Sequence, residues 1–149
     1  MTDEQCTKET KKHQDKVKDY TDFIAKAIMS RGKSHDASKL KSPELEIFAE
    51  YSDKLKGVTY GSSEYKECLE NMKVATSHHY EVNRHHPEHF ENGVKDMNLV
   101  DIVEMLCDWK AASERHANGD VMESIRKSKI RFGMSDDLTK ILLNTAKIL

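Results

Sequence analysis

The chain has 149 residues, which suits one domain with one core, and its 24 basic and 26 acidic residues nearly balance, for a net charge of −2. This balance excludes a protein that binds nucleic acid mainly by neutralising phosphates, because such a protein carries a basic excess. No apolar run approaches the roughly 20 residues of a membrane helix, the first thirteen residues do not resemble a signal peptide, and the three cysteines form no CxxC pair. We therefore expect no disulfide framework and no zinc knuckle. A reducing, cytoplasmic setting is the expected location.

Apolar residues recur at helical spacing along nearly the whole chain, and no segment has a strand pattern. The first helix is predicted from about Glu9 to Arg31, with Gly32 as its C-terminal stop and residues 1–8 mobile. Its apolar side comprises Val17, Tyr20, Ile24, Ala27 and Ile28. The letters "SPE" predict the start of a second helix, with Ser42 as N-cap and Pro43 at the first helical position.

Further helices are predicted at residues 64–82, 99–116, 121–132 and 136–149. Residues 83–98 are predicted to form a structured loop, because Pro87 disfavours a helix there. Asn98 with Asp101 predicts a capping arrangement for the helix that follows, and Ser135 predicts the N-cap of the last one. We therefore expect an all-α fold: one domain, residues 1–149, built as a bundle of five to six helices.

The segment "HHYEVNRHHPEHF", residues 78–90, holds five of the eight histidines of the chain. Imidazoles and carboxylates that converge from separate helices are the ligands of an oxygen- and nitrogen-bound divalent metal, and helical bundles build such sites in their cores. The ordered candidates are His13, His35, Asp36, His79, one of His85 and His86, and Asp108. Taken singly, each has a plainer explanation, as a buried histidine bonded to a backbone carbonyl or as a solvated carboxylate.

The order H…HD…H…H…D resembles the HD superfamily of metal-dependent phosphohydrolases, which are all-helical. The letters "HDASK" are similar to the HDxxK element of the branch that hydrolyses cyclic dinucleotides, and "HHYE" is similar to its HHE element with Tyr80 inserted. In place of that branch's Gly-Tyr-Pro turn stands "HHPEHF", and "CDWKAASER" supplies a late Asp followed by an Arg. Most of the chain also resembles a family of small phage-encoded, HD-like proteins of unassigned function.

The resemblance implies a role for each candidate. His13, His35, Asp36 and Asp108 would hold a first metal. Asp36 would bridge to a second metal held by His79 and one of His85 and His86. Lys39, with Arg84 or Arg115, would stabilise charge on a phosphate. Glu88 and His89 would orient ligand imidazoles, and His78, Glu104 and Asp101 would also lie around the ligands. The choice among Asp101, Glu104 and Asp108 as the carboxylate ligand stays open.

The implied function is hydrolysis of a small phosphate ester, a nucleotide foremost, by one or two manganese, iron or other first-row ions. We expect no duplex nucleic acid and no membrane as partner, and, for a phage-encoded chain, the host cytoplasm. Two alternatives remain: a di-iron oxygenase of the HD type, and a nucleotide- or protein-binding module in which the metal only staples helices together. Lys39 favours the phosphohydrolase over the binding module, because a structural metal site needs no cationic donor beside its ligands.

Overall fold

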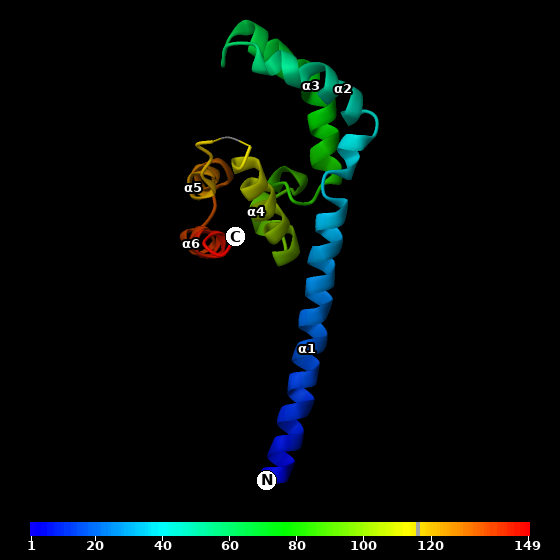
Figure 1. Ribbon diagram of the computed structural model, residues 1–149, viewed down its shortest axis with the longest axis vertical. Coiled ribbons are helices and arrows are strands. Elements are labelled where there is room, and N and C mark those ends of the chain that lie inside the picture. Colours follow the sequence, from blue (N-terminus) through cyan, green and yellow to red (C-terminus); the bar gives the residue numbers. More distant parts are fainter. Residues whose placement is uncertain (116) are drawn as a thin grey trace. The chain divides into compact units, whose positions relative to one another are not determined.

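The computed structural model describes residues 1–115 and 117–149, and no strand occurs among them. Its six α-helices are α1 Asp3–Ser34, α2 Glu44–Lys56, α3 Ser63–Val82, α4 Leu99–Ser113, α5 Val121–Phe132 and α6 Asp136–Ala146 (Figure 1). Three short 3₁₀ turns join them: η1 Ala37–Leu40, η2 Pro87–His89 and η3 Gly93–Asp96. The predicted all-α class is thus confirmed. His116, predicted as the last residue of the fourth helix, lies outside the described residues.

The chain separates into two compact units, Met1–Ser34 and His35–Leu149, where we expected one domain. The first unit is α1. It begins at Asp3, because Thr2 and Gln5 form a reciprocal cap: the Thr2 hydroxyl accepts from the Gln5 amide at 3.2 Å, and the Gln5 side chain accepts from the Thr2 amide at 2.8 Å. Residues 3–8, expected to be mobile, are therefore helical. The prediction that Gly32 stops the helix is wrong, since α1 continues to Ser34.

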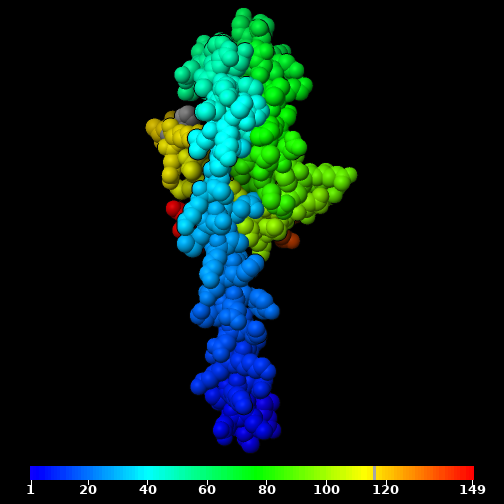
Figure 2. Space-filling view, turned by 90° about the vertical axis from the view of Figure 1, so that its right-hand side faces the viewer, coloured from blue at the N-terminus to red at the C-terminus, as the bar shows by residue number. Residues whose placement is uncertain are grey.

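In the second unit, α2 packs along α3, and the two helices lie side by side (Figures 1 and 2). The prediction that Ser42 caps α2 is wrong, because the helix begins at Glu44 with Pro43 as the flanking residue and with no side-chain cap. For α3, the Ser62 hydroxyl accepts from the Tyr65 amide at 3.1 Å, and the helix ends at Val82 as predicted.

Three N-terminal caps set the starts of α4, α5 and α6. Asn98 and Asp101 form the predicted capping box of α4, and Ser135 caps α6 as predicted. Asp120 caps α5, which Gly133 ends in the left-handed conformation. These helices and η3 enclose the apolar core, which comprises Val94, Met97, Met105, Leu106, Val121, Ile125, Met134, Leu142 and Ala146. No helix among the described residues is both long enough and apolar enough to cross a bilayer.

The two 3₁₀ turns η1 and η2 bring the sequence motifs together. η1 packs against α2 and α3, and η2 packs against α3. Residues 35–39 therefore lie beside the end of α3 and beside the histidines that follow it.

Candidate metal centre

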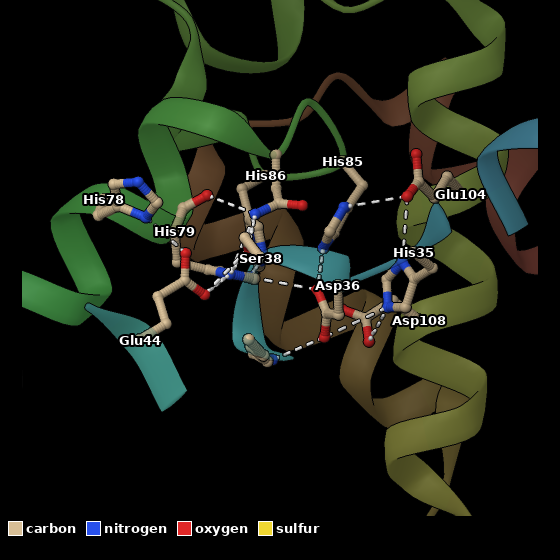
Figure 3. Close-up of polar contacts among 12 residues, drawn as sticks. His35, Asp36, Ser38, Glu44, His78, His79, His85, His86, Glu104 and Asp108 are labelled. Atoms are coloured by element: carbon tan, nitrogen blue, oxygen red, sulfur yellow. Dashed lines mark hydrogen bonds and ion pairs between the residues drawn. The ribbon is translucent and has the colours of Figure 1, made fainter. Parts of the chain in front are cut away.

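Asp36 is the residue on which the cluster converges (Figure 3). Its backbone has φ 55°, a left-handed conformation that an Asp tolerates better than most residues, and this turns the chain into η1. Its Oδ1 lies 3.3 Å from Nε2 of His79 and 3.4 Å from Nε2 of His85. Its Oδ2 lies 3.5 Å from Nε2 of His35. Three imidazoles thus present the same ring nitrogen to one carboxylate.

Two buried glutamates hold the opposite nitrogens of these rings. Glu104, on α4, places Oε1 at 3.0 Å from Nδ1 of His35 and at 3.2 Å from Nδ1 of His85. Glu44, at the start of α2, places Oε2 at 2.8 Å from Nδ1 of His79. A carboxylate on one ring nitrogen is the usual support of a histidine whose other nitrogen binds a metal.

The donor atoms are close enough together for a shared ion. Asp36, His79, His85 and His86 each offer one ligand atom, and these four atoms lie within 4.8 Å of one another. The Nε2 atoms of His79 and His86 are 2.9 Å apart. His35, His85 and Asp108 form a second such group, in which Asp108 Oδ1 is 3.5 Å from His35 Nε2. These groups could bind one metal ion or two.

Two atoms at the centre of the cluster fit a metal for a further reason. Asp36 Oδ1 and His85 Nε2 are buried and make no hydrogen bond, although they lie 3.4 Å apart. Burying a polar atom without a partner costs about 1–3 kcal/mol, and more for a charged group. A cation between them would satisfy both atoms, and the mixture of carboxylate and imidazole ligands suits a first-row divalent ion.

The surroundings of Asp36 and His86 favour the protonation states in which these two groups can bind a metal. Burial by itself raises the pKa of Asp36, but His79, His85 and the Lys39 ammonium, 2.6 Å from Oδ2, outweigh it and hold the pKa well below its usual range. Burial, with the charges of His85 and His79, lowers the pKa of His86 to about 3. His86 is therefore neutral, as a metal-bound imidazole must be.

A cavity of about 500 Å³ adjoins the cluster. Its walls include the candidate ligands Asp36, His79 and His86, and also the cationic side chains of Lys39 and Arg115. Phe48 and Tyr80 add aromatic faces to the same walls. A small anion that enters this cleft reaches the candidate metal ligands and two cations together.

Arg84, expected as a phosphate-binding residue, has another role in the structure. Its Nε and Nη2 donate to the two oxygens of Asp101 at 3.1 and 3.0 Å, and its guanidinium stacks over Phe90. Asp101 also accepts from the Asn98 amide at 3.1 Å in the cap of α4. Arg84 is not among the residues that line the cleft. Asp101 pairs with Arg84 and takes part in the N-terminal cap of α4.

Three other residues that we expected around the metal ligands contact other groups in the structure. Nδ1 of His78 donates to Oε1 of Glu44 at 2.7 Å, so His78 joins the network through Glu44 and not through a ligand imidazole. Glu88 pairs with Arg131 at 2.8 Å, and His89 bonds the backbone carbonyl of Tyr80 at 3.0 Å. These partners replace the ligand imidazoles that we expected Glu88 and His89 to orient.

His13 is exposed on α1 and belongs to the Met1–Ser34 unit, so its role as a ligand stays a prediction. The sequence interpretation missed Glu44 and Ser38, although Ser38 lies inside "HDASK". Glu44 had no such signal, because an acidic residue after "SP" reads as an ordinary helix start. Asn83, which the sequence suggested as a phosphate contact beside Arg84, donates instead to the Ser38 hydroxyl at 2.8 Å and to the His79 carbonyl at 2.9 Å.

Comparisons with known proteins match nearly the whole chain to a protein family. The model of a protein family, described as a family of unknown function (DUF5662), matches residues 2–148. Neither the curated proteins nor the solved structures contain a match to the chain. What the chain does has to be argued from the site itself.

Proposed function

The chain belongs to the DUF5662 family, whose function is unknown, and we propose that it is a metal-dependent phosphohydrolase acting on a nucleotide or a related small phosphate ester. One observation carries the proposal. The buried, unbonded Asp36 Oδ1 and His85 Nε2 lie in a cluster of metal-ligating atoms that adjoins a cleft lined by Lys39 and Arg115. A binding site for a cation and binding groups for an anion thus occur side by side.

The ligands divide between the two groups of donor atoms. Asp36, His79, His85 and His86 would hold one ion. His35 and Asp108 would hold a second, with Asp36 close enough to serve both. Carboxylate and imidazole ligands without thiolates favour manganese, iron or another first-row ion. A bound ion of this kind would lower the pKa of a water molecule toward about 7 and offset the charge of the phosphate.

Lys39 and Arg115 are the groups that would bind the phosphoryl oxygens. Lys39 Nζ is 2.6 Å from Asp36 Oδ2 and half-exposed to the cleft, so it lies between the ligand cluster and an entering phosphate. Arg115 presents a planar fork of donors from another wall of the cleft. Preorganised cations of this kind stabilise the charge that develops on the phosphoryl oxygens in the transition state.

The aromatic residues support a nucleotide over a bare phosphate. Phe48 and Tyr80 both line the cleft, and the Phe48 ring centroid is 6.0 Å from Nζ of Lys39. An aromatic face at this distance from a phosphate-binding cation offers a stacking surface for a base.

The experiment combines elemental analysis of the purified protein with phosphate release from a panel of nucleoside mono-, tri- and cyclic phosphates. We expect bound transition metal and turnover of at least one ester, both lost in Asp36→Asn. Iron with oxygen uptake and no phosphate release would instead indicate the oxygenase. Metal that stabilises the protein without any turnover would indicate the binding module.

A further inference from the structure

Glu44 is a completely buried carboxylate that is neither a proposed metal ligand nor a proposed phosphate-binding group. It is 0% exposed at the start of α2. Oε1 is 2.7 Å from Nδ1 of His78. Oε2 is 2.8 Å from Nδ1 of His79 and accepts from the Ser38 hydroxyl at 3.0 Å. A charged group is rarely buried unless it is paired, and Glu44 is paired with two imidazoles and a hydroxyl. These partners indicate what Glu44 does.

The hydrogens around His79 can be assigned by counting donors. The amide group of Asn83 has two hydrogens, and it donates to the Ser38 hydroxyl at 2.8 Å and to the His79 carbonyl at 2.9 Å. The single hydrogen of the Ser38 hydroxyl goes to Glu44. Neither group has a hydrogen left for Nδ1 of His79, although both lie near it. Nδ1 must therefore carry the hydrogen itself and donate it to Glu44, since a carboxylate only accepts.

We propose that Glu44 is a positioning residue that fixes the tautomer and the rotation of His79, so that the lone pair of Nε2 faces the metal cluster. With the hydrogen on Nδ1, Nε2 is left as an acceptor 3.3 Å from Asp36 Oδ1 and 2.9 Å from Nε2 of His86. Glu104 makes the equivalent contacts to His35 and His85, so two buried carboxylates from α2 and α4 orient three imidazoles. The inference rests on the metal-binding part of the proposed function and not on its phosphate chemistry.

The test compares the parent with Glu44→Ala and Glu44→Gln, and uses Glu46→Gln, an exposed site on the same helix, as the matched control. Nitrogen-15 NMR of the His79 ring in metal-free protein reports which nitrogen carries the hydrogen when the ring is neutral. Titration with Mn²⁺ gives the dissociation constant, and thermal melting gives the stability.

We expect the hydrogen on Nδ1 in the parent and a shift toward Nε2 in Glu44→Ala. The Mn²⁺ affinity should fall by about 10- to 100-fold in Glu44→Ala, as it does when other supports of ligating histidines are lost. Glu44→Gln should keep the Nδ1 tautomer, because its amide oxygen still accepts, and should lose less affinity. Glu46→Gln should match the parent. A merely structural role would lower the melting temperature without moving the tautomer.

The inference is overturned if the parent carries the hydrogen on Nε2, or if Glu44→Ala leaves both the tautomer and the Mn²⁺ affinity unchanged. Should Glu44→Ala not fold, Glu44→Gln decides, and an affinity equal to that of the parent would then contradict the role. If the parent binds no metal, the proposed function fails, yet the His79 tautomer in the parent and in Glu44→Ala still decides the role of Glu44.

Discussion

The two halves of the His35–Leu149 unit are stabilised in different ways. Around α4, α5 and α6, an apolar core contains Met105, Ile125 and Leu142, each at most 2% exposed, and α4 also buries Asp101 and Glu104. Around α2 and α3, the buried side chains include Glu44 and His79, whereas apolar side chains such as Leu40, Leu45, Leu69 and Val74 are exposed. The first half is held by an apolar core, and the second is organised around a polar cluster.

This difference has an energetic consequence. Apolar burial stabilises a fold in any ionic medium, but buried carboxylates and imidazoles stabilise it only when each is paired. The α2–α3 half should therefore depend on the ion that fills the cluster, and so should the face of α4 that carries Glu104 and Asp108. The apolar core of α4–α6 should depend on it much less. Substitutions placed in one half or the other can separate these contributions.

The largest effect is expected from Asp36→Asn. This change removes the charge on which three imidazoles converge, so metal binding and phosphate release should both be lost. The gain in stability on adding metal, about 2.7 kcal/mol at a metal concentration one hundred times the dissociation constant, should vanish as well. Elemental analysis and melting curves with and without Mn²⁺ measure this. Asp53→Asn, at an exposed site on α2, is the control, and equal metal content in Asp36→Asn and the parent would contradict the account.

Leu142→Ala should destabilise the other half. Leu142 is 2% exposed in the core, and removing its side chain should lower the free energy of unfolding by about 2–5 kcal/mol. The Mn²⁺ affinity of the folded variant should stay that of the parent. Urea unfolding and metal titration at a temperature where the variant is folded provide the two measurements. A loss of metal affinity in the folded variant would show that the halves are not independent.

Lys39→Ala separates an enzyme from a metal staple. The Lys39 ammonium lines the cleft but is not a ligand, so metal content and melting temperature should change little. The loss of transition-state stabilisation should be roughly 2–4 kcal/mol in kcat/KM, because a preorganised charge donor is missing. Lys41→Ala, an exposed lysine two residues away, is the matched control. Full activity of Lys39→Ala on a confirmed substrate would remove Lys39 from the mechanism.

The smallest effect is expected from Glu88→Gln. Glu88 pairs with Arg131, whose side chain is 64% exposed, and surface ion pairs contribute about 0–1 kcal/mol. Metal content and activity should be those of the parent, because Glu88 pairs with Arg131 and not with a ligand imidazole. A double-mutant cycle with Arg131→Ala measures the pair directly. A clear loss of metal in Glu88→Gln would restore the orienting role that the sequence suggested.

The helices could be predicted because their signals are local. Asn98 with Asp101 and Ser135 are caps whose partners lie three residues away, so the sequence contains both members of each contact. Thr2 and Gln5 form the same kind of local cap, so the start of α1 at Asp3 could have been predicted from the sequence. The prediction for Gly32 was wrong because a glycine inside a helix costs only about 1 kcal/mol relative to alanine. The helix therefore continues through Gly32 to Ser34.

The site was predictable only in part, because its contacts are long-range. Histidine and aspartate are distinctive residues, and their order along the chain indicated a metal cluster. Glu44 and Arg84 are ordinary residues whose roles are decided by partners far along the chain. Glu44 meets His79 from 35 residues away, and Arg84 meets Asp101 from 17 residues away. No local pattern indicates that an arginine next to five histidines is already paired.

Metal stoichiometry tests the central claim most directly. The protein is freed of metal with a chelator and titrated with Mn²⁺ by calorimetry, alongside Asp36→Asn. The account predicts at least one ion bound per parent chain and none per Asp36→Asn chain, because Asp36 Oδ1 and His85 Nε2 are buried without a hydrogen-bond partner and a cation would satisfy both. A parent chain that binds no Mn²⁺, and whose melting temperature does not change with added manganese or iron, would contradict it.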